Sequence, residues 1–171
     1  MDSGTPRGRR QTAWADSELV RSSPSQVEGI ALDETARRIL VDVGLPQSVE
    51  PLFELRAPVR VVMSDGRTAC RFGSDFGTDL VVVSPNGKIV SVSPDGSYPE
   101  RFVNSNLDRF RDFLDKVTVA RRRISLMMDE REIDSVLDDL EASLVAADAT
   151  ALVDPDNWWS VVVEQMRDGL L

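Results

Sequence analysis

The side chains that most often carry out catalysis are scarce in this sequence. It contains no histidine, so the commonest general base near neutral pH and the commonest transition-metal ligand are both missing. A Ser-His-Asp or Cys-His device cannot be built, and a zinc site is not expected from the single cysteine, Cys70. The two lysines, Lys88 and Lys116, are expected beside a turn and on a charged helix face. We therefore expect no catalytic residue, no metal and no cofactor.

A glycine pair at Gly73 and Gly77 is the nearest approach to a phosphate-binding loop. No Lys-Ser/Thr pair follows it, and no helix is expected after it. We interpret residues 73–77 as a loop between two hairpins. Cys70 lies in a predicted strand, which favours a small buried hydrophobe over a reactive thiol.

Carboxylates are most concentrated in residues 129–141, within a predicted helix. These candidates for partner binding are Asp129, Glu130, Glu132, Asp134, Asp138, Asp139 and Glu141. The stretch lacks the alternating ligands and central glycine of a calcium loop. Spacings of 4, 4 and 3 residues place four of these carboxylates on one side of the helix: Glu130, Asp134, Asp138 and Glu141. Like charges at such spacings repel by a few tenths of a kcal/mol per pair. Two interpretations remain open, a solvated helix face and a surface that meets a cationic partner.

Two adjacent tryptophans, Trp158 and Trp159, point about 100° apart on a helix. We expect at most one of them to lie fully in a narrow core stripe, and the other to lie at the edge of that stripe or to be partly exposed. Because interfaces favour tryptophan, Trp158 is added to the candidate contact residues. The pair Met127–Met128 is expected to fill gaps in the core.

The bulk composition indicates one globular domain. The chain has 171 residues and a net charge of −9, from 29 carboxylates and 20 lysines and arginines. We predict a flexible tail over residues 1–14 and a single domain over residues 15–171. The acidity disfavours nucleic-acid binding and suits either a basic partner or simple solubility. No apolar run approaches the ~20 residues of a membrane span, and the single cysteine fits the cytoplasm.

The elements that must position these residues are predicted to run from an N-terminal helix through a series of strands to a helical last third. A helix is predicted over Asp33–Val43, with Asp33 as N-cap and Gly44 as its stop. A short strand is possible at Leu19–Val20. Turns at Asp65–Gly66 and Asn86–Gly87 predict an antiparallel meander, with strands at Val59–Met63, Thr68–Phe72, Asp79–Ser84, Lys88–Ser93 and around Phe102–Val103. Every residue from Leu80 to Val83 is apolar, so that strand is expected to be covered on both faces.

The last third of the chain is predicted to be helical. One helix is expected to be capped by Asn104 or Ser105, with an inward face of Leu107, Phe110, Phe113, Leu114 and Val117. Residues 121–128 either continue or break it. A second helix is expected over Arg131–Ala147, and a third from Asp154 as N-cap with Pro155 in the first helical position. The fold class is α+β, an antiparallel β-meander sheet packed against N-terminal and C-terminal helices.

Three segments together resemble a known family. They are residues 36–46 (ARRILVDVGLP), residues 87–92 (GKIVSV) with 101–107 (RFVNSNL), and residues 154–169, which run from Asp-Pro through Trp-Trp to Gly169. In this order they resemble SUKH-superfamily immunity proteins, particularly the fourth subgroup, found in actinobacteria. The resemblance implies a SUKH-like α+β fold, no enzymatic activity, and structural roles for Gly44, Asn104 and Gly169. It also implies an antitoxin role, in which the protein binds and neutralises a polymorphic toxin, often a nuclease or deaminase.

The hypothesis from sequence is therefore an immunity protein that occludes its cognate toxin through a protein–protein interface. A nuclease binds phosphates on a basic surface, and an acidic binder associates faster with such a surface. The protein is expected to be cytoplasmic, and a monomer or weak homo-oligomer. The alternative is a non-toxin scaffold or regulatory protein-binding module of the same fold, and an undetected small-molecule or metal-dependent enzyme ranks last.

Overall fold

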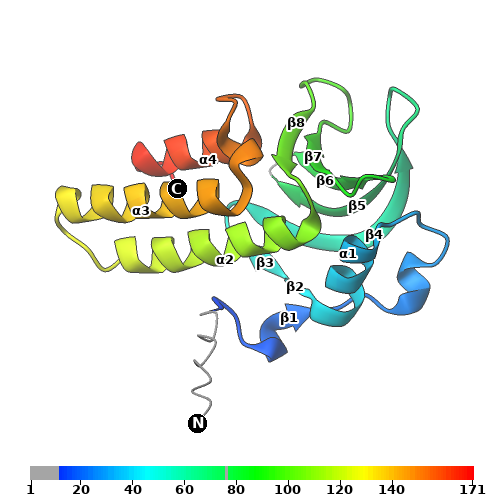
Figure 1. Cartoon of the computed structure of the whole chain (residues 1–171), viewed down its shortest axis with the longest axis horizontal. Coiled ribbons are helices and arrows are strands. Elements are labelled where there is room, and N and C mark those ends of the chain that lie inside the picture. Colours follow the sequence, from blue (N-terminus) through cyan, green and yellow to red (C-terminus); the bar gives the residue numbers. More distant parts are fainter. Residues whose placement is uncertain (1–11, 76) are drawn as a thin grey trace, which may run out of the picture.

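Six strands form one antiparallel sheet in which every strand pairs with its neighbour in the sequence (Figure 1). A computed structural model describes residues 12–75 and 77–171. The sheet order is β3 (Ser48–Val49), β4 (Phe53–Val62), β5 (Thr68–Asp75), β6 (Thr78–Val83), β7 (Ile89–Val92) and β8 (Arg101–Asn104). A separate two-stranded sheet pairs β1 (Leu19–Val20) with β2 (Leu45–Pro46). The predicted α+β class and the β-meander are confirmed.

The end of β5 differs from the sequence prediction. Residues 73–75, expected in a loop, continue β5 beyond a register shift between Arg71 and Gly73. A Cβ atom on Gly73 would lie 2.4 Å from Cε2 of Phe53, so the glycine lets an aromatic ring of the neighbouring strand β4 lie over the backbone. The interpretation of Gly73 as a loop glycine is therefore wrong; it serves close packing within the sheet.

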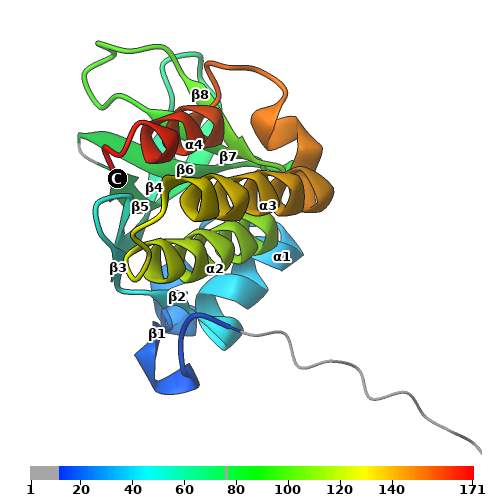
Figure 2. The same ribbon diagram turned by 90° about the vertical axis from the view of Figure 1, so that its left-hand side faces the viewer.

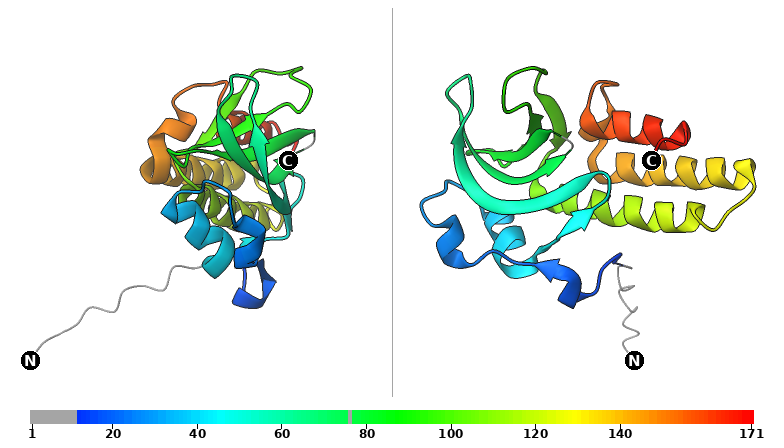
Figure 3. Two further views of the ribbon diagram at one scale, coloured as in Figure 1. Left: turned by 90° about the vertical axis from the view of Figure 1, so that its right-hand side faces the viewer. Right: turned by 180° about the vertical axis from the view of Figure 1, so that it is seen from behind.

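The sheet curls strongly, and each of its faces is covered. One face packs on the helices through fully buried side chains, among them Phe72, Leu80 and Ile89. The other face closes on itself around a small apolar cluster of Ala69, Val81, Val83 and Val90. Figure 3 shows the long β4 bending around this second face. All residues from Leu80 to Val83 are at most 1% exposed, which confirms the strand predicted to be covered on both sides.

Among the described residues, four α-helices accompany the sheet: α1 (Glu34–Arg38), α2 (Leu107–Ile124), α3 (Glu130–Asp148) and α4 (Trp158–Arg167). Helix α1 begins at the predicted cap, where the Asp33 side chain accepts from the Ala36 amide, and runs on as a π-helical turn over Ile39–Val43. Gly44, at φ 90°, ends it. Short 3₁₀ turns cover Asp16–Glu18, Pro24–Val27 and Ala149–Leu152. Helices α2, α3 and α4 lie side by side (Figure 2), and α2 buries all five predicted inward residues.

Two predicted helix starts are wrong. Asn106, not Asn104 or Ser105, caps α2, and its side chain accepts from the Arg109 amide. Helix α4 begins at Trp158 after the N-cap Asn157, whereas Asp154 forms a preceding turn by accepting from the Asp156 amide. Asn104 and Ser105 are engaged by Asp148 far along the chain, and Asp154 by the nearby Asp156 amide. Capping propensity alone therefore selected the wrong residues.

The predicted N-terminal tail lies mostly outside the described residues. Its described part, residues 12–14, packs on α2: the Ala13 amide donates to Oδ1 of Asp115 at 2.8 Å, and Arg122 Nη1 donates to the Ala13 carbonyl at 2.8 Å. Ala13 is buried, and burial raises the pKa of the Asp115 carboxyl. These three residues therefore belong to the packed structure, while a flexible tail over residues 1–11 stays a prediction.

Candidate protein-binding surface

The carboxylates predicted on one helix do lie on α3, but they divide between two of its sides. Glu130, Asp134, Asp138 and Glu141 form the expected row, and at 100° per residue Glu132 and Asp139 lie on the other side of the helix. The row meets a cation of this chain, because Arg167 of α4 donates to Asp138 Oδ1 and Glu141 Oε2 at 2.8 Å each. These two carboxylates raise the pKa of the Arg167 guanidinium through their hydrogen bonds. One part of the predicted binding row is thus used to join α3 to α4.

The remaining carboxylates make no ion pair with any described residue. Asp129 caps α3 by accepting from the Arg131 amide at 2.8 Å, and Glu132 is exposed. Glu130 and Asp134 line a hollow of about 830 Å³ beside the start of α3, whereas Asp139 lines a separate groove between α2 and α3. The unpaired acidic groups therefore concentrate near the first turns of α3.

The loop that connects α2 to α3, residues 125–129, is the hairpin tip, and it exposes large apolar side chains. Leu126 is 86% exposed and Met128 is 98% exposed, while Met127 between them packs against the core. The tip projects at the end of the molecule away from the curled sheet (Figures 1 and 2). The prediction that Met128 fills the core is wrong, and sequence reasoning missed both exposed residues. The sequence did carry a signal for this loop. Asp129, followed three residues later by Glu132, is an N-cap pattern that begins α3 at Glu130 and leaves residues 126–128 in a loop.

Both adjacent tryptophans are buried. Trp158 is 4% exposed and Trp159 is fully buried, and their rings meet edge to face with centroids 4.6 Å apart. Helix α4 contacts α3 and also strand β8, so its covered surface is wider than a single stripe. Trp158 Nε1 donates to Oδ2 of Asp75, which lies on β5. The alternative in which one indole is partly exposed is wrong, and Trp158 presents no ring face to a partner in this structure.

A buried polar network fixes the opposite end of the α2–α3 hairpin. Asp148, the last residue of α3, accepts from Asn104 Nδ2 at 3.2 Å and from the amide and hydroxyl of Ser105 at 2.8 Å each. Asn104 Oδ1 in turn accepts from Trp159 Nε1 at 2.7 Å. Every buried polar group in this chain of contacts has a partner, so its role is to join β8, α3 and α4.

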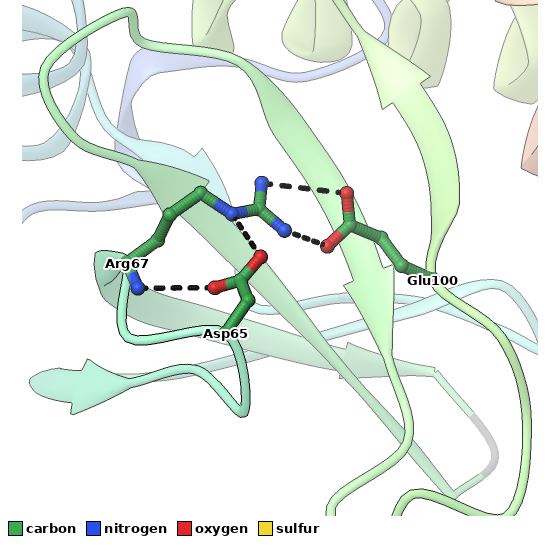
Figure 4. Close-up of polar contacts among 3 residues, drawn as sticks. All are labelled: Asp65, Arg67 and Glu100. Carbon is green, nitrogen blue, oxygen red and sulfur yellow. Dashed lines mark hydrogen bonds and ion pairs between the residues drawn. The ribbon is translucent and has the colours of Figure 1, made fainter.

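A third cluster of charged residues lies at the rim of the curled sheet (Figure 4). Arg67, after the β4–β5 turn, donates to the carboxylates of Asp65 and Glu100, and its backbone amide donates to Asp65 Oδ1 at 3.0 Å. Glu100 immediately precedes β8, so the cluster joins two segments that are far apart in the strand order. The backbone hydrogen bond from Arg67 lowers the pKa of Asp65, and the hydrogen bond to Glu100 raises that of Arg67. This cluster connects the β4–β5 turn to the segment before β8, with two carboxylates sharing one guanidinium.

The remaining groups that could carry chemistry are the cysteine thiol and side chains able to bind a metal. Burial raises the pKa of the Cys70 thiol to about 11, which keeps it protonated and unreactive. Within residues 12–75 and 77–171, no three His, Cys, Asp or Glu side chains gather closely enough to hold a metal ion. No helix among the described residues is both long and apolar enough to cross a membrane.

Comparison with family models matches residues 6–165 to the SUKH-4 immunity protein family. The matched range includes the whole sheet, both helices of the α2–α3 hairpin and most of α4. No curated protein and no solved structure matches the chain significantly.

Proposed function

The chain belongs to the SUKH-4 immunity protein family, and from this premise we propose that it binds and neutralises a cognate toxin of a polymorphic toxin system. The family match over residues 6–165 is the observation that carries the proposal. The toxin is proposed to be a nuclease or deaminase, and neutralisation is proposed to occur by occlusion of its active face. We propose that the encounter occurs in the cytoplasm, because a chain with one buried cysteine forms no internal disulfide and needs no oxidising environment.

The charge of the chain supports a basic partner. The net charge is −9, and the carboxylates at the start of α3 make no ion pair with a described residue. An enzyme that acts on nucleic acid must hold phosphates, so its active face carries lysines and arginines. Attraction between such a face and α3 would raise the association rate and orient the encounter. The proposed contact residues are Asp129, Glu130, Glu132, Asp134 and Asp139, with Asp138 and Glu141 contributing less because Arg167 already pairs with them.

We propose that the cognate toxin is encoded next to this gene, and co-expression with the toxin domain found there tests the proposal. Cells that express the toxin domain alone are expected to stop growing, and cells that also express this chain are expected to grow. The purified pair should co-elute, with an affinity that falls as salt is raised. The negative control is Gly73→Leu, which places a side chain against Phe53 within the sheet. This variant should give no protection, because the chain should unfold.

Two results would contradict the proposal. One is growth arrest that this chain does not relieve although it is folded and abundant. The other is protection without any complex, which would indicate an effect on toxin expression rather than occlusion. Stable binding to a protein other than the toxin, without protection, would favour the scaffold alternative.

A further inference from the structure

We propose that the hollow where α4 meets the sheet, the α4–sheet hollow, binds a small zwitterion with an apolar body, of the class of the free apolar α-amino acids. In this site the ligand's ammonium group pairs with Asp75 and its carboxylate pairs with Arg101. The hollow is lined from β5, β6, β7, residues 98–101, α4 and residues 170–171, and its volume is about 580 Å³. Sites for small molecules are concave, with volumes of about 300–1,000 Å³. The inference does not depend on the proposed function.

Two side chains of opposite charge face this hollow, and they are the only charged ones among the described residues that line it. They are Asp75 at the end of β5 and Arg101 at the start of β8. No ion pair joins them, and neither pairs with another described residue. Burial raises the pKa of Asp75, and the hydrogen bond from Trp158 and the nearby charge of Arg101 act to lower it. The two charges are therefore close enough to interact and still leave space between them.

The fold orients the carboxylate of Asp75 but uses only one of its oxygens. Oδ2 accepts from Nε1 of Trp158, which is itself 4% exposed, whereas Oδ1 accepts from no described residue. The guanidinium of Arg101 donates to no described residue either, although its side chain is half-buried. Neither group has a fully buried atom that lacks a partner, so the free atoms of both reach solvent. Both charges are thus held in place and accessible to a ligand.

The lining between and around the two charges is largely apolar. Leu52 and Val161 contribute to it, and Leu170 and Tyr98 are 71% and 67% exposed where they line it. Of the hydroxyls in the hollow, that of Ser91 donates to Thr78 Oγ1 at 2.8 Å and is already satisfied. An apolar ligand body would therefore bury apolar surface, while the polar groups left for a ligand are mainly the two charges.

The opposite signs of these charges select the ligand. An anion such as a phosphate, a nucleic-acid strand or a lipid headgroup would meet Arg101 but would also lie against the carboxylate of Asp75. A cation meets the converse repulsion, and a neutral apolar molecule would cover both charges without a partner, which is costly. A ligand that carries both charges satisfies both side chains at once. An apolar α-amino acid has this combination together with a body that suits the apolar lining.

The first experiment titrates the full chain with L-leucine and with L-phenylalanine and measures binding by calorimetry and by the rise in melting temperature. Three probes each lack one feature of phenylalanine: the N-acetyl derivative has no ammonium group, the amide has no carboxylate, and glycine has no apolar body. We expect at least one of the two amino acids to bind with a Kd of about 1 mM or tighter. Each of the three probes is expected to bind about tenfold more weakly or worse, because it loses one of the contacts.

The second experiment locates the site with two variants that each remove one charge. Asp75→Asn keeps an oxygen that accepts from Trp158, and Arg101→Gln keeps a polar side chain. The matched controls are Glu28→Gln and Arg60→Gln, which remove exposed charges that pair with no described residue and lie outside the hollow. Circular dichroism confirms that each variant is folded. We expect each site variant to bind the amino acid about tenfold more weakly than the parent, and each control to bind within about twofold of it.

Three results would overturn this inference, and none of them bears on protection against the toxin. One is a folded parent that binds neither amino acid at about 10 mM, a concentration that detects even weak sites. Another is unchanged binding in both site variants, which would place the ligand elsewhere. The third is loss of affinity for the toxin domain, but not for an amino acid, in Asp75→Asn and Arg101→Gln, which would assign the hollow to a protein partner.

Discussion

The two ends of the α2–α3 hairpin differ in how far the fold buries their apolar side chains and pairs their polar groups. At the base, Asp148 accepts three hydrogen bonds and Trp159 is fully buried with its indole nitrogen paired. At the tip, Leu126 and Met128 are exposed, and Glu130 beside them makes no ion pair with a described residue. Within one hairpin, the base joins several elements of the fold through buried contacts, and the tip leaves large apolar side chains exposed to solvent. Substitutions should therefore lower stability far more at the base than at the tip.

The largest effect is expected from Trp159→Ala at the base. The substitution removes a fully buried indole that contacts Phe110, Phe113 and Trp158 and donates to Asn104. Loss of a buried aromatic side chain lowers the free energy of unfolding by about 3–5 kcal/mol. Urea unfolding followed by far-ultraviolet circular dichroism measures the change. A loss below about 1 kcal/mol would mean that this end of the hairpin is not where stability resides.

Asp148→Ala should have the next largest effect. It leaves the Ser105 amide and the Asn104 amide group without their acceptor in a buried site. Unsatisfied buried groups of this kind cost about 1–3 kcal/mol each, and relaxation toward solvent recovers part of that, so we expect a loss of about 2–3 kcal/mol. Glu132→Ala, which removes an exposed carboxylate near the tip, is the control and should change stability by less than about 0.5 kcal/mol. Equal losses in the two variants would remove the distinction between the two ends.

The sequence predicted the parts of this arrangement that depend on local pattern. Apolar spacing predicted the inward face of α2, and turn residues predicted the meander, because each is decided within a few residues. The burial of Trp158 depends on α3 and the sheet together, and its partner Asp75 is 83 residues away in the chain. The Asn104–Asp148 contact spans 44 residues and the Arg67–Glu100 pair spans 33. Contacts of that range, and hence the division of carboxylates into paired and unpaired, have no signature in one sequence.

A smaller, pH-dependent effect is expected at Asp75, which accepts from Trp158. Burial raises the pKa of this carboxyl, although the Trp158 hydrogen bond and the Arg101 charge both act to lower it. The folded protein therefore keeps this proton to a higher pH than the unfolded chain, whose value is near 3.8. The carboxyl thus favours folding at low pH, and that contribution is lost as pH rises from about 3.8 through the raised pKa.

Asp75→Asn removes this titration while keeping an oxygen that accepts from Trp158. We expect the variant to gain stability relative to the parent as pH rises above about 4, and to show no such gain below it. Trp158→Phe removes the hydrogen bond that lowers the pKa, so stability should fall over a wider pH range than in the parent. Urea midpoints measured from pH 3 to pH 8 test both. A stability difference between Asp75→Asn and the parent that does not change with pH would contradict the assignment.

The smallest effect on stability is expected at the tip itself. Leu126→Ser with Met128→Ser should leave the free energy of unfolding within about 0.5 kcal/mol of the parent, because side chains that are 86% and 98% exposed lose almost no burial when truncated. Met127→Ser is the matched control on the same loop: its side chain packs against the core, and its replacement should destabilise the protein measurably. If the tip pair proved as costly as Met127, these side chains would be supporting the fold, and the contrast between the two ends would not hold.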